Sequence, residues 1–455
     1  MPDIILVILA VIFVLGIAIN IHEFGHFIVA KLFGMRVEAY SFFGLGPRIW
    51  GFKVGHTDYR ISAIPLGAYV KLYGDEATAA LEGGESEGDP VPASELYELR
   101  PRWQKFLVML GGPFMNVVLA LSIPFFVALS LGLPSMPAPI VGMVSTGGAA
   151  EQAGVKPGDR IVGVDGIENP TWENVRDNGL ISPDRDLSLT VERDGQRIPL
   201  TVQPKKVVVS GNPIGELGMA PDAGVEPVEV GMVVPGSAAE EAGLKPGDKV
   251  ISYNGKAVRN SQELTLLIRE HKDAPANLTI ERTGQRMELP IAARADEGGV
   301  YRVGVGFGAG TVDTYVPATV GGAAMFAYET NMRVLRLTGK VFGQMFSGER
   351  SVKDAGLSGP VGIVRTIASA VEGDRVWLNL FSLLTAISLS LGIFNLLPIP
   401  LLDGGQIMVL GIEKVFSWFG ATLSMAIREK IQFAGLGIIL LLMVFTLFLD
   451  ISRFF

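Results

Sequence analysis

The chain has 455 residues, of which 49% are hydrophobic, and its mean hydropathy of +0.39 is too high for an ordinary soluble protein. The formal net charge of −8 argues against nucleic acid as the main partner. The absence of cysteine excludes disulfide bonds, thiolate metal ligands and a thiol nucleophile.

Four long apolar runs account for this composition, at residues 4–21, 106–133, 376–402 and 431–449. Each reaches the roughly 20 residues with which a helix crosses the hydrocarbon core of a lipid bilayer. The first run could instead be a signal peptide, but no basic residue precedes it, which favours a retained helix. We therefore expect a multi-span α-helical membrane protein with four transmembrane helices.

The runs predict the organisation of the whole chain. Transmembrane helices are expected at 1–33, 103–133, 376–403 and 431–450, with connecting segments at 34–102 and 404–430 and a long region between the second and third helices. Lysine and arginine are concentrated in the two connecting segments, which should therefore be cytoplasmic. Both termini and the long region would then lie on the other side of the membrane. In a bacterium, that side is the periplasm and the membrane is the inner membrane, which a multi-pass protein of this kind would span.

The first predicted helix carries ionisable residues in the stretch 20-NIHEFGHFIVA-30. On a helix, His22 and His26 lie on the same face, where both imidazoles can bind one metal ion. Glu23 is then placed to act on a metal-bound water. The alternative is that both histidines are buried core residues bonded to backbone, but ionisable groups within a span are costly and indicate a functional site.

The stretch 75–98 contains many acidic residues and no basic residue. This composition is typical of a solvated, flexible loop. It accounts for part of the negative charge of the chain.

The long central region contains an internal repeat. Residues 142–166 and 231–255 align without a gap at an offset of 89 residues, so 138–222 and 227–310 are two copies of one module. In each copy, a strand leads into a short helix that ends at glycine, followed by K-P-G-D and an alternating strand.

This pattern resembles the PDZ domain family, which implies two tandem PDZ-like β-sandwich modules. Such modules take extended peptides in a groove by adding a strand to a sheet edge. The Gly-rich stretches 213–219 and 302–308 are the groove candidates. Two alternatives stay open: the modules bind peptide or protein ligands, or they are spacers that bind none.

Residues 311–375 follow the modules. The segment 317–346 is expected to be an amphipathic helix, which could lie on the membrane or pack on the modules.

A catalytic zinc site needs three protein ligands, so the two histidines need a third. His56 lies in a polar turn and His271 in the repeat, so both are poor candidates. Asp403 is better, because it closes the third run on the same side as His26. Two prolines before it should interrupt the helix, and Gly404–Gly405 permit a sharp turn that aims the carboxylate at the metal. The alternative is a plain helix end with the carboxylate in water.

Three motifs, 22-HEFGH-26, 111-GGPFMN-116 and 395-NLLPIPLLDGG-405, resemble the site-2 protease family of intramembrane zinc metalloproteases. Four spans with two PDZ-like modules between the second and third resemble its bacterial members. The resemblance implies a membrane-reentrant β region, which the short apolar strands of 41–76 fit.

The family resemblance also implies the site residues. Matched motif by motif, the Zn²⁺ ligands are His22, His26 and Asp403, and Glu23 is the catalytic base. Asn395 is expected near the substrate or the transition state. A candidate edge strand from Tyr59 to Leu72 would hold the substrate extended by strand addition.

The substrate implied by the resemblance is a single-span membrane protein, such as an anti-sigma factor already shortened by another protease. Its cleavage would be regulated intramembrane proteolysis in a sigma-E envelope stress response, with the PDZ pair as a size filter. Two rival functions are a non-catalytic scaffold that recruits periplasmic partners and a metal transporter. The transporter would need a polar path that the fourth apolar run lacks.

Overall fold

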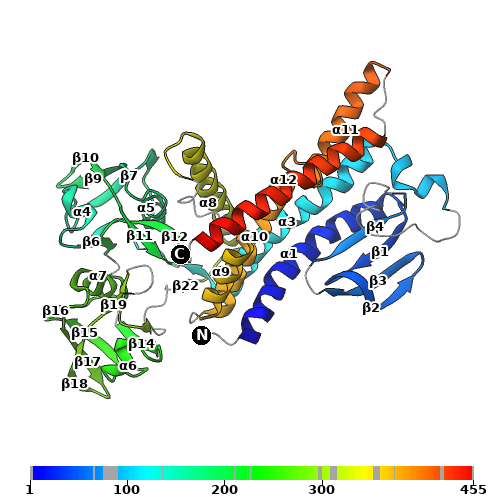
Figure 1. Cartoon of the computed structure of the whole chain (residues 1–455). Coiled ribbons are helices and arrows are strands. Elements are labelled where there is room, and N and C mark those ends of the chain that lie inside the picture. Colours follow the sequence, from blue (N-terminus) through cyan, green and yellow to red (C-terminus); the bar gives the residue numbers. More distant parts are fainter. Residues whose placement is uncertain are drawn as a thin grey trace. The chain divides into compact units, whose positions relative to one another are not determined.

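The computed structural model describes residues 4–64, 67–74, 91–135, 137–209, 212–222, 224, 228–295, 300–307, 315–351, 359–372, 375–420 and 425–452. The chain forms two compact units (Figure 1). Unit 1 comprises Met1–Ser130, Thr319–Val334 and Ser358–Ser452, and unit 2 comprises Leu131–Ala318 and Leu335–Leu357. Of the predicted acidic loop, residues 75–90 lie outside the described residues, and the 3₁₀ turns η1 (Ala93–Glu95) and η2 (Tyr97–Leu99) follow them.

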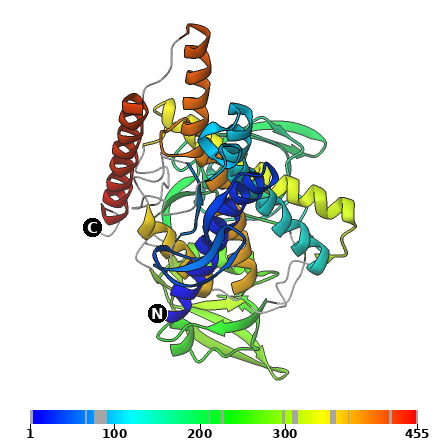
Figure 2. The same cartoon turned by 90° about the vertical axis from the view of Figure 1, so that its right-hand side faces the viewer.

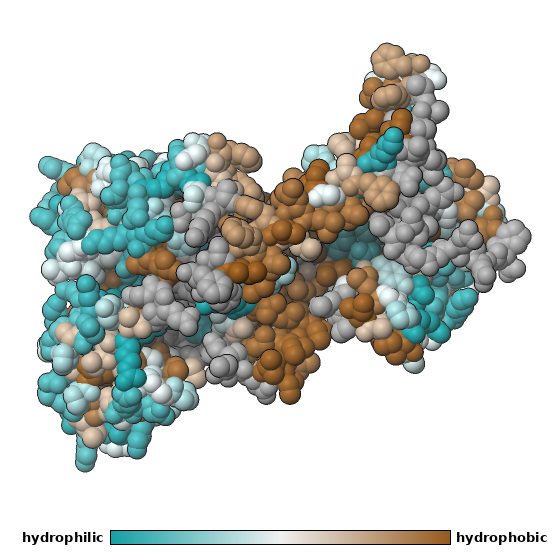
Figure 3. Space-filling view, viewed as in Figure 1, coloured by the Kyte–Doolittle hydropathy of each residue, from teal (hydrophilic) through white to brown (hydrophobic). Residues whose placement is uncertain are grey.

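Within the described residues, four helices are long and apolar enough to cross a membrane. They are α1 (Ile4–Leu32), α3 (Arg102–Leu131), α10 (Val376–Asn395) and the part Lys430–Ile451 of α12 (Met425–Ser452). Their apolar side chains are widely exposed, as for Leu441 at 69% and Phe448 at 65%. Figure 3 shows hydrophobic side chains gathered over α1 and α12, as expected for helices surrounded by lipid.

Helices α1 and α3 lie side by side (Figures 1 and 2) because glycines face each other at their contact. A Cβ added to Gly25 would lie 2.1 Å from the Gly111 carbonyl oxygen, and one added to Gly111 would lie 2.6 Å from that of Gly25. Small residues let the two backbones approach this closely. Both helices continue beyond the contact, which therefore fixes their separation at the level of the histidines.

A four-stranded sheet follows α1 in unit 1. Its strands are β1 (Val37–Ser41), β2 (Leu45–Val54), β3 (Thr57–Ile64) and β4 (Tyr69–Leu72), in the order β2-β3-β1-β4. Strand β1 pairs parallel with β3 and antiparallel with β4, and the hairpin β2–β3 is drawn in blue in Figure 2.

The predicted edge strand from Tyr59 to Leu72 is only half right. Strand β3 has β2 on one side and β1 on the other, so the prediction of a free edge is wrong there. The parallel β1–β3 pairing is a contact between strands that are not adjacent in sequence, which local patterns do not reveal. Strand β4 does lie at an edge of the sheet.

Unit 2 contains the repeated modules. Module 1 consists of β6 (Val141–Val144), α4 (Ala149–Gln152), β7 (Arg160–Val164), β8 (Ile167–Glu168), α5 (Trp172–Leu180), β9 (Leu187–Arg193), β10 (Gln196–Val202), β11 (Lys205–Val209), β12 (Asn212–Glu216) and β13 (Met219–Pro221). Module 2 consists of β14 (Val228–Val233), α6 (Ala238–Glu241), β15 (Lys249–Tyr253), β16 (Lys256–Ala257), α7 (Ser261–His271), β17 (Ala276–Arg282), β18 (Gln285–Ile291), β19 (Arg294–Ala295), β20 (Tyr301–Arg302) and β21 (Val305–Phe307). Strands β5 (Leu133–Pro134) and β22 (Tyr315–Val316), which flank the pair of modules, hydrogen-bond to each other.

In each module, the same ion pair joins an arginine at the end of a strand to the aspartate of the K-P-G-D turn. Asp159 accepts hydrogen bonds from Arg193 at 2.6 and 2.7 Å, and Asp248 accepts the same two from Arg282. Burial alone would raise the pKa of both aspartates, but the arginine hydrogen bonds prevail and hold each pKa below its usual value. The two copies, which are 89 residues apart in sequence, therefore make the same ion pair in the structure.

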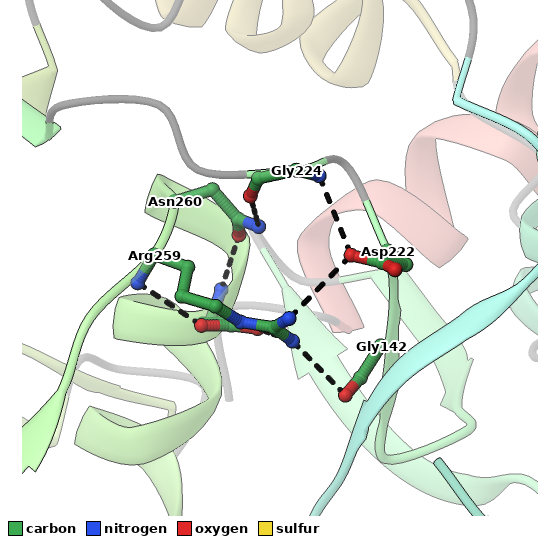
Figure 4. Close-up of polar contacts among 6 residues, drawn as sticks. Gly142, Asp222, Gly224, Arg259 and Asn260 are labelled. Atoms are coloured by element: carbon green, nitrogen blue, oxygen red, sulfur yellow. Dashed lines mark hydrogen bonds and ion pairs between the residues drawn. The ribbon is translucent and has the colours of Figure 1, made fainter. Parts of the chain in front are cut away.

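The two modules also contact each other through Arg259, just before α7 (Figure 4). Its guanidinium donates to the Gly142 carbonyl of module 1 at 3.1 Å and lies 3.5 Å from Asp222. Buried Glu263 accepts from the same guanidinium, and Asn260 caps α7 by accepting from the Glu263 backbone N–H. The modules therefore share a polar interface within unit 2.

The segment after the modules forms α8 (Val320–Phe346) and α9 (Pro360–Glu372). Lys340 of α8 donates to Asn178 of module 1 at 2.6 Å and pairs with Asp165, so this part of the helix packs on a module. That was one of the two alternatives for 317–346.

Candidate active site

Helix α1 carries His22 and Glu23 on one turn and His26 on the next. The spacing of four residues stacks the two imidazoles on one face, and their Nε2 atoms lie 3.2 Å apart. Only 6% of His22 and 8% of His26 is exposed. Two nitrogen ligands thus converge inside the molecule, as the motif predicted.

Asp403 reaches the histidines because a non-helical loop interrupts the helices between α10 and α11. That helix ends at Asn395, and the next helix, α11 (Asp403–Trp418), begins at Asp403 itself. Between them the backbone turns at Leu401, which has a left-handed φ of 84°. The sharp turn therefore precedes Asp403, and the prediction that Gly404–Gly405 form it is wrong.

The two glycines serve close packing instead. Both lie in the first turn of α11, where a Cβ on Gly404 would lie 2.2 Å from the Leu396 carbonyl oxygen. A Cβ on Gly405 would lie 2.1 Å from the Ile399 carbonyl oxygen. Their absent side chains let α11 start directly against the loop it leaves, which holds the Asp403 carboxylate near α1.

The three side chains form the single group of convergent metal-ligand atoms among the residues that the structure describes. His22 Nε2 lies 3.1 Å from Asp403 Oδ2, and His26 Nε2 lies 3.4 Å from Oδ1. Tetrahedral ligands about 2.0–2.1 Å from zinc would be about 3.3 Å from one another. The donor set and its spacing therefore fit a zinc ion with an open fourth position. His56 and His271 are not in this group.

A cavity of about 320 Å³ opens onto the three ligands. Glu23 and Asn395 line it, and Asn395 Nδ2 lies 3.2 Å from His22 Nε2. Strand β4 supplies Tyr69 and Val70 to its wall, and the Val70 backbone is within hydrogen-bond reach of the Glu23 carboxylate. The cavity thus joins the ligand cluster, one carboxylate, one amide and a sheet edge.

Helix α3 contributes two features that the sequence analysis left without a role. A Cβ on Gly112 would lie 2.4 Å from His26 Nε2, so this glycine leaves room for the ligand cluster. Asn116 contacts His22 Nδ1 at 3.2 Å. Both belong to 111-GGPFMN-116, and that motif was the available signal.

Comparison with known proteins finds similarity along nearly the whole chain. The family model described as peptidase family M50 matches residues 10–442. Protease RseP of Yersinia pestis is 32% identical over 466 residues and covers 98% of both chains. Regulator of sigma-E protease RseP of Escherichia coli K12 is 31% identical over 460 residues, covering 96% of this chain and 97% of that protein. A Vibrio cholerae protein named as a zinc metalloprotease is 31% identical over 480 residues and covers 100% of both.

One of the solved structures that resemble the chain matches a small part of it. The PDZ domain of an SdrC-like protein from Listeria monocytogenes is 21% identical, with a TM-score of 0.17, and it covers 18% of this chain and 87% of that one.

Gly112→Ala should abolish metal binding, because its methyl group would take the space beside His26 Nε2. Alanine otherwise favours a helix over glycine, so the fold should not suffer from propensity. The test is the metal content per purified chain, with Gly437→Ala as control, since a Cβ there meets nothing within 4 Å. Equal metal content in the two variants would show that Gly112 is not needed to make room for the ion.

Proposed function

The chain belongs to peptidase family M50, the site-2 protease family, and is a zinc metalloprotease; from this premise we propose that it hydrolyses a peptide bond within the transmembrane segment of a single-span membrane protein. The observation that carries the proposal is the convergence of His22, His26 and Asp403 beside Glu23 in one cavity between apolar helices. Ionisable groups in such surroundings are retained for function.

The proposed mechanism uses four of these residues and a water molecule. His22, His26 and Asp403 would hold the zinc ion, whose Lewis acidity would lower the pKa of a bound water to about 7. Glu23 accepts a proton from the water as its oxygen attacks the scissile carbonyl carbon, then donates that proton to the leaving amine as the C–N bond breaks. The products are a carboxylate and an amine, and no covalent enzyme intermediate forms.

Asn395 is proposed to stabilise the transition state. Its amide nitrogen lies 3.2 Å from His22 Nε2, at the rim of the ligand cluster. An N–H donor at this place can hydrogen-bond to the negative oxygen that develops on the scissile carbonyl.

A helical substrate hides its carbonyl groups in its own hydrogen bonds, so it must unwind before hydrolysis. The free edge of β4 offers a partner for the unwound strand, because Tyr69 and Val70 line the cavity next to Glu23. Main-chain hydrogen bonds to β4 would replace those lost from the helix. We propose β4, rather than the whole of Tyr59 to Leu72, as the substrate-binding edge.

The surroundings of the site suggest its place in the cell. The apolar helices and the relatives support a multi-pass protein of a bacterial inner membrane. We propose that the modules and both termini are periplasmic, since lysine and arginine gather in the opposite segments. Because relatives are named as regulators of sigma-E, we propose an anti-sigma factor, already shortened outside the membrane, as substrate in an envelope stress response.

The repeated modules are proposed to be PDZ-like and to filter substrates by size. Their repeated sequence pattern and strand order support this, and the polar contact around Arg259 joins them into one body. A body of this kind on the periplasmic side would exclude substrates that still carry a large outer domain. We also propose that the modules bind peptide or protein ligands.

Glu23→Gln should reduce cleavage of a tagged single-span reporter in membranes by about 100- to 10,000-fold, because the amide cannot accept the proton from water. Bound zinc should stay near one ion per chain, since Glu23 is outside the ligand group. The measurement pairs reporter cleavage with zinc content. Cleavage that survives the substitution would favour a structural role for the motif and a non-catalytic scaffold.

Val70→Pro should slow cleavage by about tenfold, because it removes one N–H from the β4 edge. Since that N–H also faces Glu23, zinc content and the effect of adding Glu23→Gln should be measured in the same variant. The matched control is Ile49→Pro on the opposite edge of the sheet, where a register shift between Arg48 and Trp50 leaves Ile49 out of the ladder. Equal rates for the two proline variants would argue against strand addition at β4.

Deletion of residues 138–310 should let the enzyme cleave an unshortened substrate as fast as a shortened one, because the proposed filter is gone. The same deletion combined with Glu23→Gln should cleave neither. The measurement is the ratio of the two cleavage rates in membranes. Continued resistance of the unshortened substrate would place the filter elsewhere.

A further inference from the structure

The His22 ring is held on two sides, and only one side faces the ligand cluster. Its Nε2 atom faces His26 and Asp403, while Nδ1 faces Asn116 of α3 at 3.2 Å. Asn116 is 0% exposed and carries an uncharged but strongly polar amide between apolar helices. Such a group is costly to bury unless it is fully hydrogen-bonded, so its hydrogen-bond partners indicate its role.

His26 illustrates what a metal-binding histidine requires. Its Nδ1 atom lies 2.7 Å from the Val108 carbonyl oxygen, which can only accept a hydrogen bond. The proton of neutral His26 must therefore sit on Nδ1, which leaves the lone pair of Nε2 free for a metal. Outer partners of this kind select the tautomer of a ligand and typically change metal affinity.

Among the residues that the structure describes, the partner of His22 Nδ1 is not a backbone carbonyl but the Asn116 amide, which can present either an oxygen or an NH₂ group. With NH₂ toward Nδ1, the ring must carry its proton on Nε2 and cannot bind metal there. A half-turn of the amide presents Oδ1 instead, which accepts from Nδ1–H and frees the Nε2 lone pair. The orientation of one amide is therefore coupled to the tautomer of one ligand.

A third helix holds the amide. Ser388 of α10 is 0% exposed, and its hydroxyl donates to the Asn116 backbone carbonyl at 2.9 Å. The same hydroxyl oxygen lies 3.4 Å from the side-chain Oδ1 of Asn116. After the half-turn, the amide nitrogen faces the Ser388 oxygen, whose lone pairs can accept from it. Gly392 permits this approach, because a Cβ there would lie 3.3 Å from the Asn116 Cβ.

From this geometry we propose that Asn116 is a positioning residue that selects the metal-binding tautomer of His22, with Ser388 holding its amide. The inference rests on the zinc ligands of the proposed function. It concerns metal binding and not peptide hydrolysis, so zinc affinity tests it separately from cleavage.

The experiment measures the zinc dissociation constant of the detergent-solubilised whole chain by competition with a chelator. Asn116→Leu removes the acceptor for Nδ1–H and should weaken zinc binding by about 10- to 100-fold. Asn116→Asp restores an acceptor in the same place and should bind zinc at least as tightly as the original chain. The matched control is Asn331→Leu, which removes a buried asparagine that bonds to the Ala120 carbonyl of the same helix α3.

Unchanged zinc affinity in Asn116→Leu would overturn the proposal, and so would an equal loss in Asn331→Leu. Should Asn116→Leu fail to fold, Ser388→Ala decides the question, because it keeps the amide but frees it to turn. That variant should weaken zinc binding by about tenfold. Wild-type affinity in Ser388→Ala together with weak binding in Asn116→Asp would also overturn the assignment.

Discussion

The close contact of α1 and α3 at Gly25 and Gly111 is the constraint on which the site depends. In surroundings where lipid tails are as apolar as side chains, helices gain little from hydrophobic burial and associate through close packing and hydrogen bonds. The glycines bring the two backbones together at the level of the histidines, since Gly25 lies between His22 and His26 in the sequence. With a larger side chain at this level, α3 could not place Gly112 and Asn116 against the imidazoles.

The same constraint explains how polar groups are tolerated among apolar helices. Each ring nitrogen of the two histidines faces a polar partner, on the outer side Val108 or Asn116 and on the inner side Asp403. The broken backbone between α10 and α11 is covered by the first turn of α11, since Gly404 and Gly405 have no side chains to hold it away. Irregular backbone at membrane depth persists when protein or a wet cavity covers it.

Unit 2 is stabilised differently, because each of its two modules has a small apolar core and the same aspartate–arginine ion pair. Each module has its own cluster of buried side chains, and each repeats the contact between an aspartate and an arginine 34 residues later. The interface around Arg259 is polar, with a buried Glu263 balanced by the guanidinium. Unit 1, by contrast, exposes many apolar side chains and buries His22, His26 and Asp403 at the candidate site.

The sequence alone determined the features that depend on local periodicity. Hydrophobic length predicted the four apolar helices of membrane-spanning length among the described residues. The 89-residue offset predicted the repeat, and the spacing of four placed His22 and His26 on one helical face. Only the tertiary structure decided the features that join segments far apart in the chain. It placed β3 inside the sheet and β4 at its edge, moved the turn before Asp403 to Leu401, and set Asn116 behind a ligand 94 residues away. Local patterns report which face a side chain occupies, whereas its partner across the molecule is set by how helices and strands pack, and that packing leaves no local period in the sequence.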